Sequence, residues 1–353
     1  MKRILITLLT LAFLGQFGAG QADARQNGKD RAGGGQAGKD QTAIADATVP
    51  PHPVATLRRD FKDTFPIPAG EKLEYEIKIS RFPIYASLGV LTFENLGPVT
   101  IGQNSDPAAG ERRQAPGPLI EGINTEFTPA PDEQLWRLRA TAVSKGIFVT
   151  LLGFEANYRY ETLVDMRDFS ARVNVIEVKE GKKHVIQSAL FDRDEQQVRY
   201  LTTDVNNPAA KRAKPLPREE GTLSLLSAIY FLRLQKLKQG QIITFPVSSD
   251  EANYHFEIIV GKRESLKTDC GKVKTIRLEP KLFGPGHLFS KVKGDMILWV
   301  SDDNKRTPLR LVARTSRGTI TAKLLNFKNK CNIIEQGDEK REIDENNGGE
   351  IER

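Results

Sequence analysis

The side chains in this sequence that could do chemistry are mainly carboxylates, and some occur as close pairs: Asp165 with Asp168, Asp192 with Asp194, and Asp302 with Asp303. Two carboxylates that face each other across a groove could cleave a glycosidic bond, and several together could bind calcium. Asp and Asn also favour tight turns, because they tolerate unusual backbone angles and hydrogen-bond locally. Asp302, Asp303 and Asn304 are therefore interpreted as a turn between two strands, and the other pairs as strand ends.

The histidines form no site that the sequence alone reveals. None belongs to the metalloprotease pattern HExxH or to a local ligand pair, and the chain has no Gly-x-Ser-x-Gly nucleophile turn or GxxxxGK[ST] phosphate loop. We therefore expect no catalytic residue, no metal and no cofactor, and a protein that is not an enzyme. The four histidines are His52, His184, His255 and His287.

Cys270 and Cys331 are the only two cysteines in 353 residues, which excludes a disulfide-stapled scaffold and a cysteine-rich metal site. In an oxidising compartment they could form one disulfide, which would close a loop of about sixty residues and contribute ~4 kcal/mol in the chain-entropy model. Two unpaired thiols are the alternative. No histidine or predicted helix start lies beside either cysteine, so we expect neither to act as a nucleophile.

Residues 1–24 have the pattern of a cleaved secretory signal. Lys2 and Arg3 precede an apolar run from Ile4 to Phe17, and residues 22–24 have the small-x-small form of a cleavage site. This run is shorter than the ~20 residues that a spanning helix needs, and no later segment is long and apolar enough. No cysteine near the cleavage site could carry a lipid anchor. We expect a periplasmic or secreted protein without a transmembrane segment.

The rest of the chain is predicted to hold one folded body between two disordered flanks. Residues 25–60 have almost no large apolar side chains, and residues 331–353 are dense in charge, so neither segment can offset the entropy cost of ordering. Residues 61–330 should form a single domain. The formal net charge of +7 favours acidic partners without naming one, and no basic run with interleaved aromatic residues suggests nucleic acid.

Within the body, apolar residues recur with period two between turn residues, which is typical of strands with one buried face. The clearest run is 71–80, and similar runs lie at 136–142, 173–177, 254–260 (ending before Gly261), 273–278, 296–300, 309–316 and 319–327. Arg317-Gly318 is predicted to join the last two as a hairpin. Roughly a dozen or more short strands predict a mainly β fold, with one large antiparallel sheet that curls into an open or spiral barrel.

One segment, residues 222–238, is predicted to be a helix of about four turns. Thr222 or Ser224 can cap its start, and Gly240 can end it. A helix this apolar must be covered, so we expect it to pack against the concave side of the sheet, either as a plug over a ligand cavity or as a core helix that fills the interior. Its apolar residues share one face or lie beside it: Leu223, Leu225, Leu226, Ile229, Tyr230, Leu232, Leu234 and Leu237.

Two connections depart from the strand pattern. Residues 97–122 are rich in Gly, Pro and polar side chains, and they indicate an exposed insertion. Residues 281–290 place Leu, Phe and Gly-Pro-Gly together in a loop that could contact a membrane or a ligand, or fold back over an end of the barrel. From the helix and this loop, the candidate ligand-binding residues are Leu226, Ile229, Tyr230, Leu282, Phe283 and Phe289.

Four stretches together resemble a known family. They are GEKLEYEIKIS from Gly70, LSLLSAIYFLRLQKLKQGQIITFPV from Leu223, LKTDCGKVKTIRLEP from Leu266 and ILWVSDDNKRTPLRL from Ile297. The chain is similar to a family of secreted bacterial proteins known only as domain of unknown function 3108. The similarity covers most of residues 65–327. The resemblance implies an envelope-associated protein with a large rolled antiparallel sheet, and it carries over no catalytic residues.

These features predict a non-enzymatic protein of the cell envelope whose rolled sheet could hold an apolar, lipid-like ligand. Two alternatives stay open. The protein could be a scaffold with a solid core that meets another envelope protein through strand edges or residues 97–122. It could also be an enzyme that acts on polysaccharide through a carboxylate pair. A hollow apolar interior and a packed core would point to different classes.

Overall fold

The computed structural model describes residues 67–325, apart from 82, 100–126, 128, 130–132, 147–148, 150–154, 270, 285, 291, 317 and the side chains of 208–212. The predicted signal (1–24), leader (25–60) and charged tail (331–353) lie outside the described residues. So do Cys270, Cys331 and residues 100–122 of the predicted insertion.

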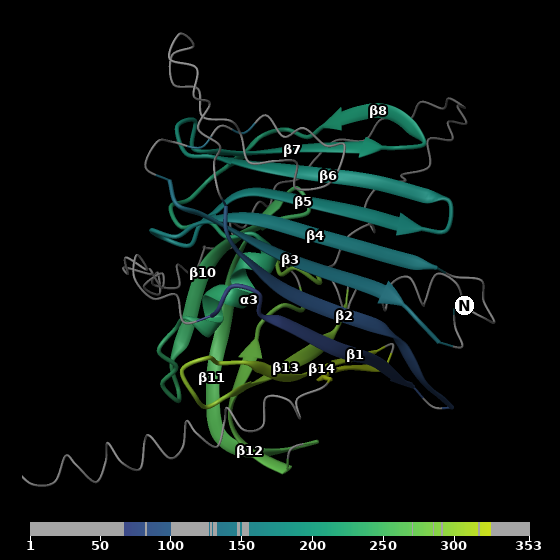
Figure 1. The fold of residues 1–353 in the computed structure, drawn as a ribbon, viewed down its shortest axis with the longest axis vertical. Coiled ribbons are helices and arrows are strands. Elements are labelled where there is room, and N and C mark those ends of the chain that lie inside the picture. The colour runs from purple at the N-terminus through teal and green to yellow at the C-terminus, as the bar shows by residue number, and fades with distance from the viewer. Residues whose placement is uncertain are drawn as a thin grey trace, which may run out of the picture.

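The described residues form one antiparallel sheet of fifteen strands and the helix α3 (Figure 1), which confirms the prediction of a mainly β fold. The helix spans Leu225–Arg233. The strands are β1 (Lys72–Arg81), β2 (Ile84–Pro98), β3 (Leu135–Ser144), β4 (Ala156–Asp165), β5 (Ala171–Glu180), β6 (Lys183–Asp192), β7 (Gln197–Asp204), β8 (Asn207–Arg212), β9 (Leu216–Pro217), β10 (Ile242–Ser249), β11 (Ala252–Thr268), β12 (Gly271–Pro280), β13 (Gly294–Ser301), β14 (Pro308–Thr315) and β15 (Gly318–Leu324).

The order of the strands leaves the sheet open, and its edges are not the first and last strands of the chain. β1 lies in the middle, where it pairs with both β2 and β15. From there the pairing runs outward to β8 on one side and to β10 on the other, while β9 pairs with β7. The two edges of the sheet are therefore β8 and β10.

Between these edges the chain forms a junction, which we call the seam, consisting of β7, residues 216–224 and β10. On one side, the carbonyl of Thr222 accepts a hydrogen bond at 3.1 Å from the N–H of Ala171, the first residue of β5. On the other, Leu223 donates to the carbonyl of Pro246 at 3.0 Å and accepts from the N–H of Ser248 at 2.9 Å. The segment before α3 thus ties the two halves of the sheet together.

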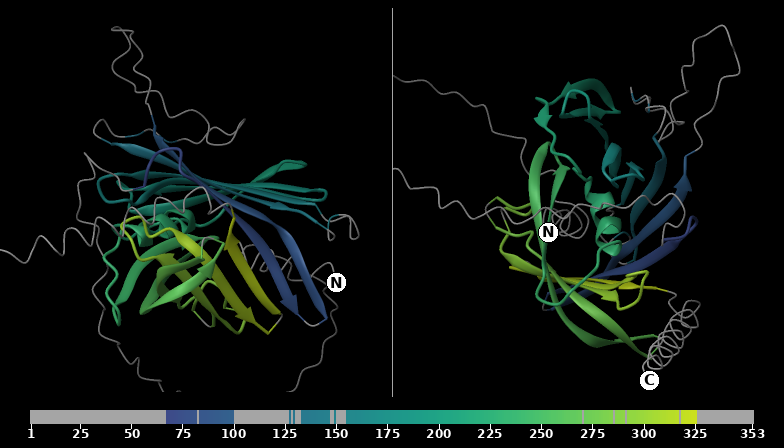
Figure 2. Two further views of the ribbon diagram at one scale, coloured as in Figure 1. Left: turned by 60° about the horizontal axis from the view of Figure 1, so that its bottom comes forward. Right: turned by 90° about the vertical axis from the view of Figure 1, so that its left-hand side faces the viewer.

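The seam curls the sheet into an open barrel with α3 on its concave side. Tyr200 of β7 and Ser248 of β10 hydrogen-bond across it through buried hydroxyls 2.9 Å apart. The right panel of Figure 2 shows α3 enclosed by the green strands β10 and β11, the yellow C-terminal strands and the blue N-terminal strands. The helix therefore lies where its apolar surface is covered by strands on several sides.

The predicted helix over 222–238 is too long, because α3 contains nine residues and ends at Arg233. Ser224 is the N-cap, and it forms a reciprocal capping box with Ser227. After Arg233 the N–H groups of Leu234 and Gln235 bond to carbonyls three residues earlier rather than four. Such bonds tighten the last turn and end the helix.

Arg233 also fixes the end of α3 to the sheet. Its guanidinium donates to both carboxylate oxygens of Glu71, at 2.6 and 2.9 Å, and its Nε donates to the carbonyl of Lys305 at 3.1 Å. The side chains of Arg233 and Glu71 are only 2% and 7% exposed. This buried, bidentate pair holds the helix against the start of β1.

Two other predicted boundaries differ from the structure. β11 continues through Gly261 to Thr268, because a register shift beside this glycine inserts a bulge instead of ending the strand. A Cβ atom on Gly261 would lie 3.2 Å from the carbonyl oxygen of Arg277, so the bulge favours glycine. Gly97 and Pro98, assigned by the sequence to the insertion, complete β2 and pair with β3.

Candidate ligand-binding cavity

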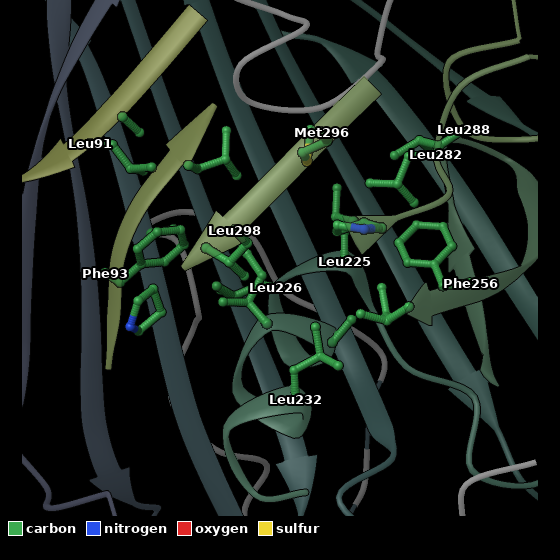
Figure 3. Close-up of a pocket in the computed structure, with 18 of the residues that line it drawn as sticks. Leu91, Phe93, Leu225, Leu226, Leu232, Phe256, Leu282, Leu288, Met296 and Leu298 are labelled. Atoms are coloured by element: carbon green, nitrogen blue, oxygen red, sulfur yellow. The ribbon is translucent and has the colours of Figure 1, made fainter. Parts of the chain in front are cut away.

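An apolar cavity of about 180 Å³ lies on the concave side of the sheet, between α3 and the strands (Figure 3). Its walls come from α3, from β1–β4, from β10–β15 and from the loop at 281–290. Arg310 is the only residue in the lining whose side chain is charged. The cavity thus belongs to the sheet as a whole rather than to one segment.

The helix supplies one wall through a single face. Leu225, Ala228, Ile229 and Leu232 line the cavity together with Leu226. The first four follow the spacing i, i+3, i+4 and i+7, which puts them on one side of an α-helix. Ala228 is the smallest of these side chains, so the helix surface is lowest at its centre.

The opposite wall consists of the inward positions of the strands. Tyr75 and Phe93 pack edge to face, with ring centroids 5.7 Å apart and planes at 81°. The hydroxyl of Tyr75 donates to the carbonyl of Pro308 at 2.8 Å, so this polar group is satisfied. Burial raises the pKa of Tyr75 and that of Tyr160, another lining residue, so both phenols stay neutral at ordinary pH.

The loop at 281–290 folds back over this part of the barrel. Leu282, Leu288 and Phe289 are 7–8% exposed, and all three line the cavity. The N–H of Phe289 donates to the carbonyl of Leu282 at 2.8 Å, and the rings of Phe283 and Phe289 lie 5.0 Å apart. The loop therefore folds back over the barrel, and its Leu282 and Phe289 also border the candidate ligand cavity.

The structure brings four of the six candidate residues together on the cavity wall: Leu226, Ile229, Leu282 and Phe289. Phe283 packs behind Phe289 and is not part of the lining. Tyr230 is 1% exposed and lies beside Arg233, whose guanidinium carbon is 5.5 Å from its ring centroid. It therefore packs at the helix anchor instead of lining the cavity.

Most of the lining was missed by the sequence analysis, because it comes from strand residues such as Phe93, Tyr160, Phe245, Phe256 and Met296. Period-two alternation marks positions of this kind as inward-facing, and Phe256 lies in a run that the sequence does predict. Alternation does not distinguish an inward residue that packs from one that borders a space. That difference depends on how far the sheet curls around α3.

The carboxylate pairs serve the turns, as the sequence predicts for Asp302 and Asp303. Asp303 Oδ1 accepts the N–H groups of Lys305 and Arg306, both at 2.9 Å. Asp192 Oδ1 accepts the N–H of Asp194 at 3.0 Å. None of these carboxylates borders the cavity.

Two of the three described histidines, His184 and His255, each pair with one carboxylate. His184 lies 2.7 Å from Glu177, and His255 lies 2.9 Å from Glu219. Within the described ranges there is no group of three or more His, Cys, Asp or Glu residues that could hold a metal ion. The described part of the chain also has no helix of the length and apolarity needed to cross a membrane.

Comparison with known proteins gives a family and two distant structural relatives. A family model described as a protein of unknown function (DUF3108) matches residues 122–325. The chain is similar to a beta-barrel-like protein of domain of unknown function DUF1849 from Brucella abortus, with 12% identity and a TM-score of 0.42, over 73% of this chain and 96% of that one. It is also similar to a protein of inferred export with a YmcC-like fold from Bacteroides fragilis, with 8% identity and a TM-score of 0.27, over 74% and 96%. No curated protein matches it.

Proposed function

This chain belongs to the DUF3108 family of proteins of unknown function, and we propose that it is a non-enzymatic protein of the cell envelope that binds a small apolar ligand between α3 and the sheet. The cavity is the observation that carries the proposal. At ~24 cal/mol per Å³ for an enclosed cavity, an empty space of about 180 Å³ would cost at most on the order of 4 kcal/mol. That is a large part of the 5–15 kcal/mol by which domains are stable, so a ligand that fills the space is favoured.

The lining selects the chemical class of the ligand. An apolar cavity of about 150 Å³ in another protein stays free of water and binds benzene, and the present cavity is of similar size. A water molecule needs two to four polar partners, and apart from Arg310 and the hydroxyls of Tyr75 and Tyr160 the described lining is apolar. A neutral ring or the end of one acyl chain would instead restore the dispersion contacts that the wall residues lack.

The envelope location rests on the secretory pattern of residues 1–24. Expressing the complete chain and measuring the mass and location of its product tests this part. We expect a product that starts after Ala24 and is released with the contents of the envelope. A product of full mass in the cytoplasm would contradict the location but leave the cavity proposal standing.

The binding proposal is tested with N-phenyl-1-naphthylamine, an uncharged aromatic probe whose fluorescence rises in apolar surroundings. We expect saturable binding by the wild type. Ala228→Leu and Ala140→Leu each place a larger side chain in the cavity from opposite walls, and each should weaken binding at least tenfold. Leu225→Met conserves volume on the same helix face, and it should leave binding within about threefold of the wild type.

Two outcomes would contradict the proposal. One is a wild-type protein that gives no saturable fluorescence change. The other is retention of wild-type affinity by both filling variants, provided that their circular dichroism and melting show them to be folded. Lipid extraction of protein purified without detergent, followed by mass spectrometry, then identifies the natural ligand.

A further inference from the structure

A cluster of buried charges lies where two turns of the sheet meet, the turn between β4 and β5 and the turn between β6 and β7. Three arginines form ion pairs with carboxylates there. Arg167 and Arg193 both bind Asp165 at 2.7 Å, and Arg193 also binds Asp168 at 2.9 Å. Arg172 binds Glu133 at 2.6 Å. Three positive and three negative groups are thus matched. Among these residues the charges balance.

Arg218 is a fourth arginine in this cluster, and it is not matched. It follows β9, and its backbone N–H donates to the carbonyl of Gln196 in the turn between β6 and β7. The residue is only 7% exposed, and its buried Nε has no hydrogen-bond partner. No ion pair joins its guanidinium to any carboxylate in the described ranges.

The surroundings of Arg218 oppose its charge. Burial lowers the pKa of its guanidinium, and the neighbouring charge of Arg193 lowers it further. Asp168 and Glu220 act in the other direction, but Asp168 is already bound to Arg193 and Glu220 is exposed. A guanidinium remains protonated in proteins, so this site holds a largely buried positive charge whose Nε has no hydrogen-bond acceptor in the protein. Such a charge is strongly unfavourable unless an anion compensates it.

We propose that Arg218 is the centre of an anion-binding site that takes a single carboxylate group. The geometry of the ligand follows from the guanidinium, whose planar fork matches the two oxygens of a carboxylate. The charge of the ligand follows from the ion pairs of the cluster, because Arg218 is the one of its four arginines without a paired carboxylate, and Glu220, which also acts on Arg218, is exposed to water. A doubly charged phosphate would overcompensate the charge of Arg218 beside Asp168 and the exposed Glu220. This site is independent of the apolar cavity.

The carboxylate could come from a free small acid or from the C-terminus of a peptide, and the small exposed fraction of Arg218 favours the smaller molecule. Formate represents the free acid, and acetyl-alanyl-alanine represents the peptide terminus, with its C-terminal amide as the uncharged match. Each is added to the mature protein at constant ionic strength, with chloride as the reference. The readouts are the melting temperature and saturation-transfer difference NMR signals of the probe.

We expect the melting temperature of the wild type to rise in proportion to the logarithm of the formate concentration, and to rise more than in chloride at the same ionic strength. Formate should also show saturation transfer from the protein. Arg218→Gln should lose both effects. Arg314→Gln should keep them, because Arg314 is a half-exposed arginine of β14 that pairs with Asp295 in another part of the sheet. A response to the acetylated dipeptide but not to its amide would identify a peptide terminus as an accepted source, whereas a response to formate alone restricts the site to small acids.

Absence of a formate response in the wild type, or an equal response in Arg218→Gln, would overturn the proposal. Arg218→Met provides a separate check that does not need a ligand. Removal of an uncompensated charge should leave the melting temperature in chloride unchanged or higher. A clear drop would mean that the guanidinium already has a partner within the protein, and it would also overturn the proposal.

Discussion

In the described part of the chain, every buried charged side chain except Arg218 has at least one ion-pair partner. Glu161 has no exposed surface and points to the face of the sheet opposite the cavity. Its carboxylate accepts hydrogen bonds from the Nε atoms of Arg137 at 2.6 Å and of Arg139 and Arg159 at 2.8 Å. Each such carboxylate depends on its partners, because a buried charge that loses its counter-charge keeps the desolvation cost without the attraction.

The Glu71–Arg233 pair gives a direct test of this dependence. Glu71→Gln would leave Arg233 charged and buried at the end of α3, and it should reduce the free energy of unfolding by ~3–5 kcal/mol in urea titrations. The control is Glu74→Gln, which removes only an exposed pair with Lys72 and should cost less than ~1 kcal/mol. Equal losses in the two variants would contradict a special role for the anchor.

Asp250 should make stability fall as the pH rises. Burial, followed by the charge of Glu251, raises the pKa of Asp250 to about 6 in the folded protein. An unfolded Asp titrates near 3.9, so the folded chain binds more protons between these two values. Its stability therefore decreases with rising pH across this window. Tyr160, Tyr200 and Tyr254 lie near this carboxyl group and stay neutral here.

Asp250→Asn removes this titration. Position 250 has φ of +53°, a conformation that Asn tolerates well, so the backbone should adapt easily. We expect the melting temperature of the variant to rise relative to that of the wild type from pH 4 to pH 7, with most of this relative rise between pH 4 and pH 6. A difference that stays constant across these pH values would argue against the raised pKa.

At the scale of elements, register shifts adapt long strands to the curled sheet. One shift lies between β1 and β2, where Ile77 pairs with Gly89 and Lys78 with Ser87. A Cβ atom on Gly89 would lie 2.2 Å from the carbonyl oxygen of Val143 on β3. Three strands therefore meet closely at a position where only glycine fits.

Gly89→Ala should consequently destabilise the protein by ~2 kcal/mol or more, since strand backbones rather than a flexible side chain would have to move. Gly261→Ala is the matched control, because this glycine also lies at a bulge but leaves 3.2 Å to the nearest atom. It should cost clearly less in the same denaturant titration. A larger loss for Gly261→Ala would contradict the close approach at Gly89.

The sequence predicts those elements that depend on local residue patterns, and it misses features that depend on contacts between distant residues. The alternation in 71–80 predicts β1 well: Leu73, Tyr75, Ile77 and Ile79 are all 5% exposed or less. The bulge at Gly261 and the early end of α3 were not predicted, because both are set by contacts with distant residues. Arg233 finds Glu71 only after the sheet has formed. The cavity follows the same rule, since its helix wall is visible in the sequence and its strand wall is not.

At the scale of the whole molecule, the seam joins the two edge regions of the open barrel. Strand pairing continues without interruption from β10 through β1 to β8, whereas the seam depends on residues 216–224 and on the hydroxyl pair of Tyr200 and Ser248. Edge strands have fewer partners than central ones, so opening should start there.

Tyr200→Phe removes the hydroxyl pair and leaves Ser248 buried without it. We expect a loss of ~1 kcal/mol and faster hydrogen exchange in β10, with little change in β1 and β15 at the middle of the sheet. Tyr254→Phe is the control, because Tyr254 lies on β11, its ring packs against Phe256 and its hydroxyl makes no hydrogen bond across the seam to any described residue. Uniformly faster exchange over all strands in Tyr200→Phe would contradict opening at the seam.

The pairing of β1 with β15 has a consequence for the chain's connectivity. Tyr75 lies opposite Leu324, and Leu325 donates to the carbonyl of Glu74 at 2.6 Å, so the polypeptide enters and leaves the sheet at neighbouring points. A short linker could join these two points, and new termini could be opened between β8 and β9. Such a circular permutant would keep every strand neighbour of the natural protein while beginning and ending at the sheet's own border.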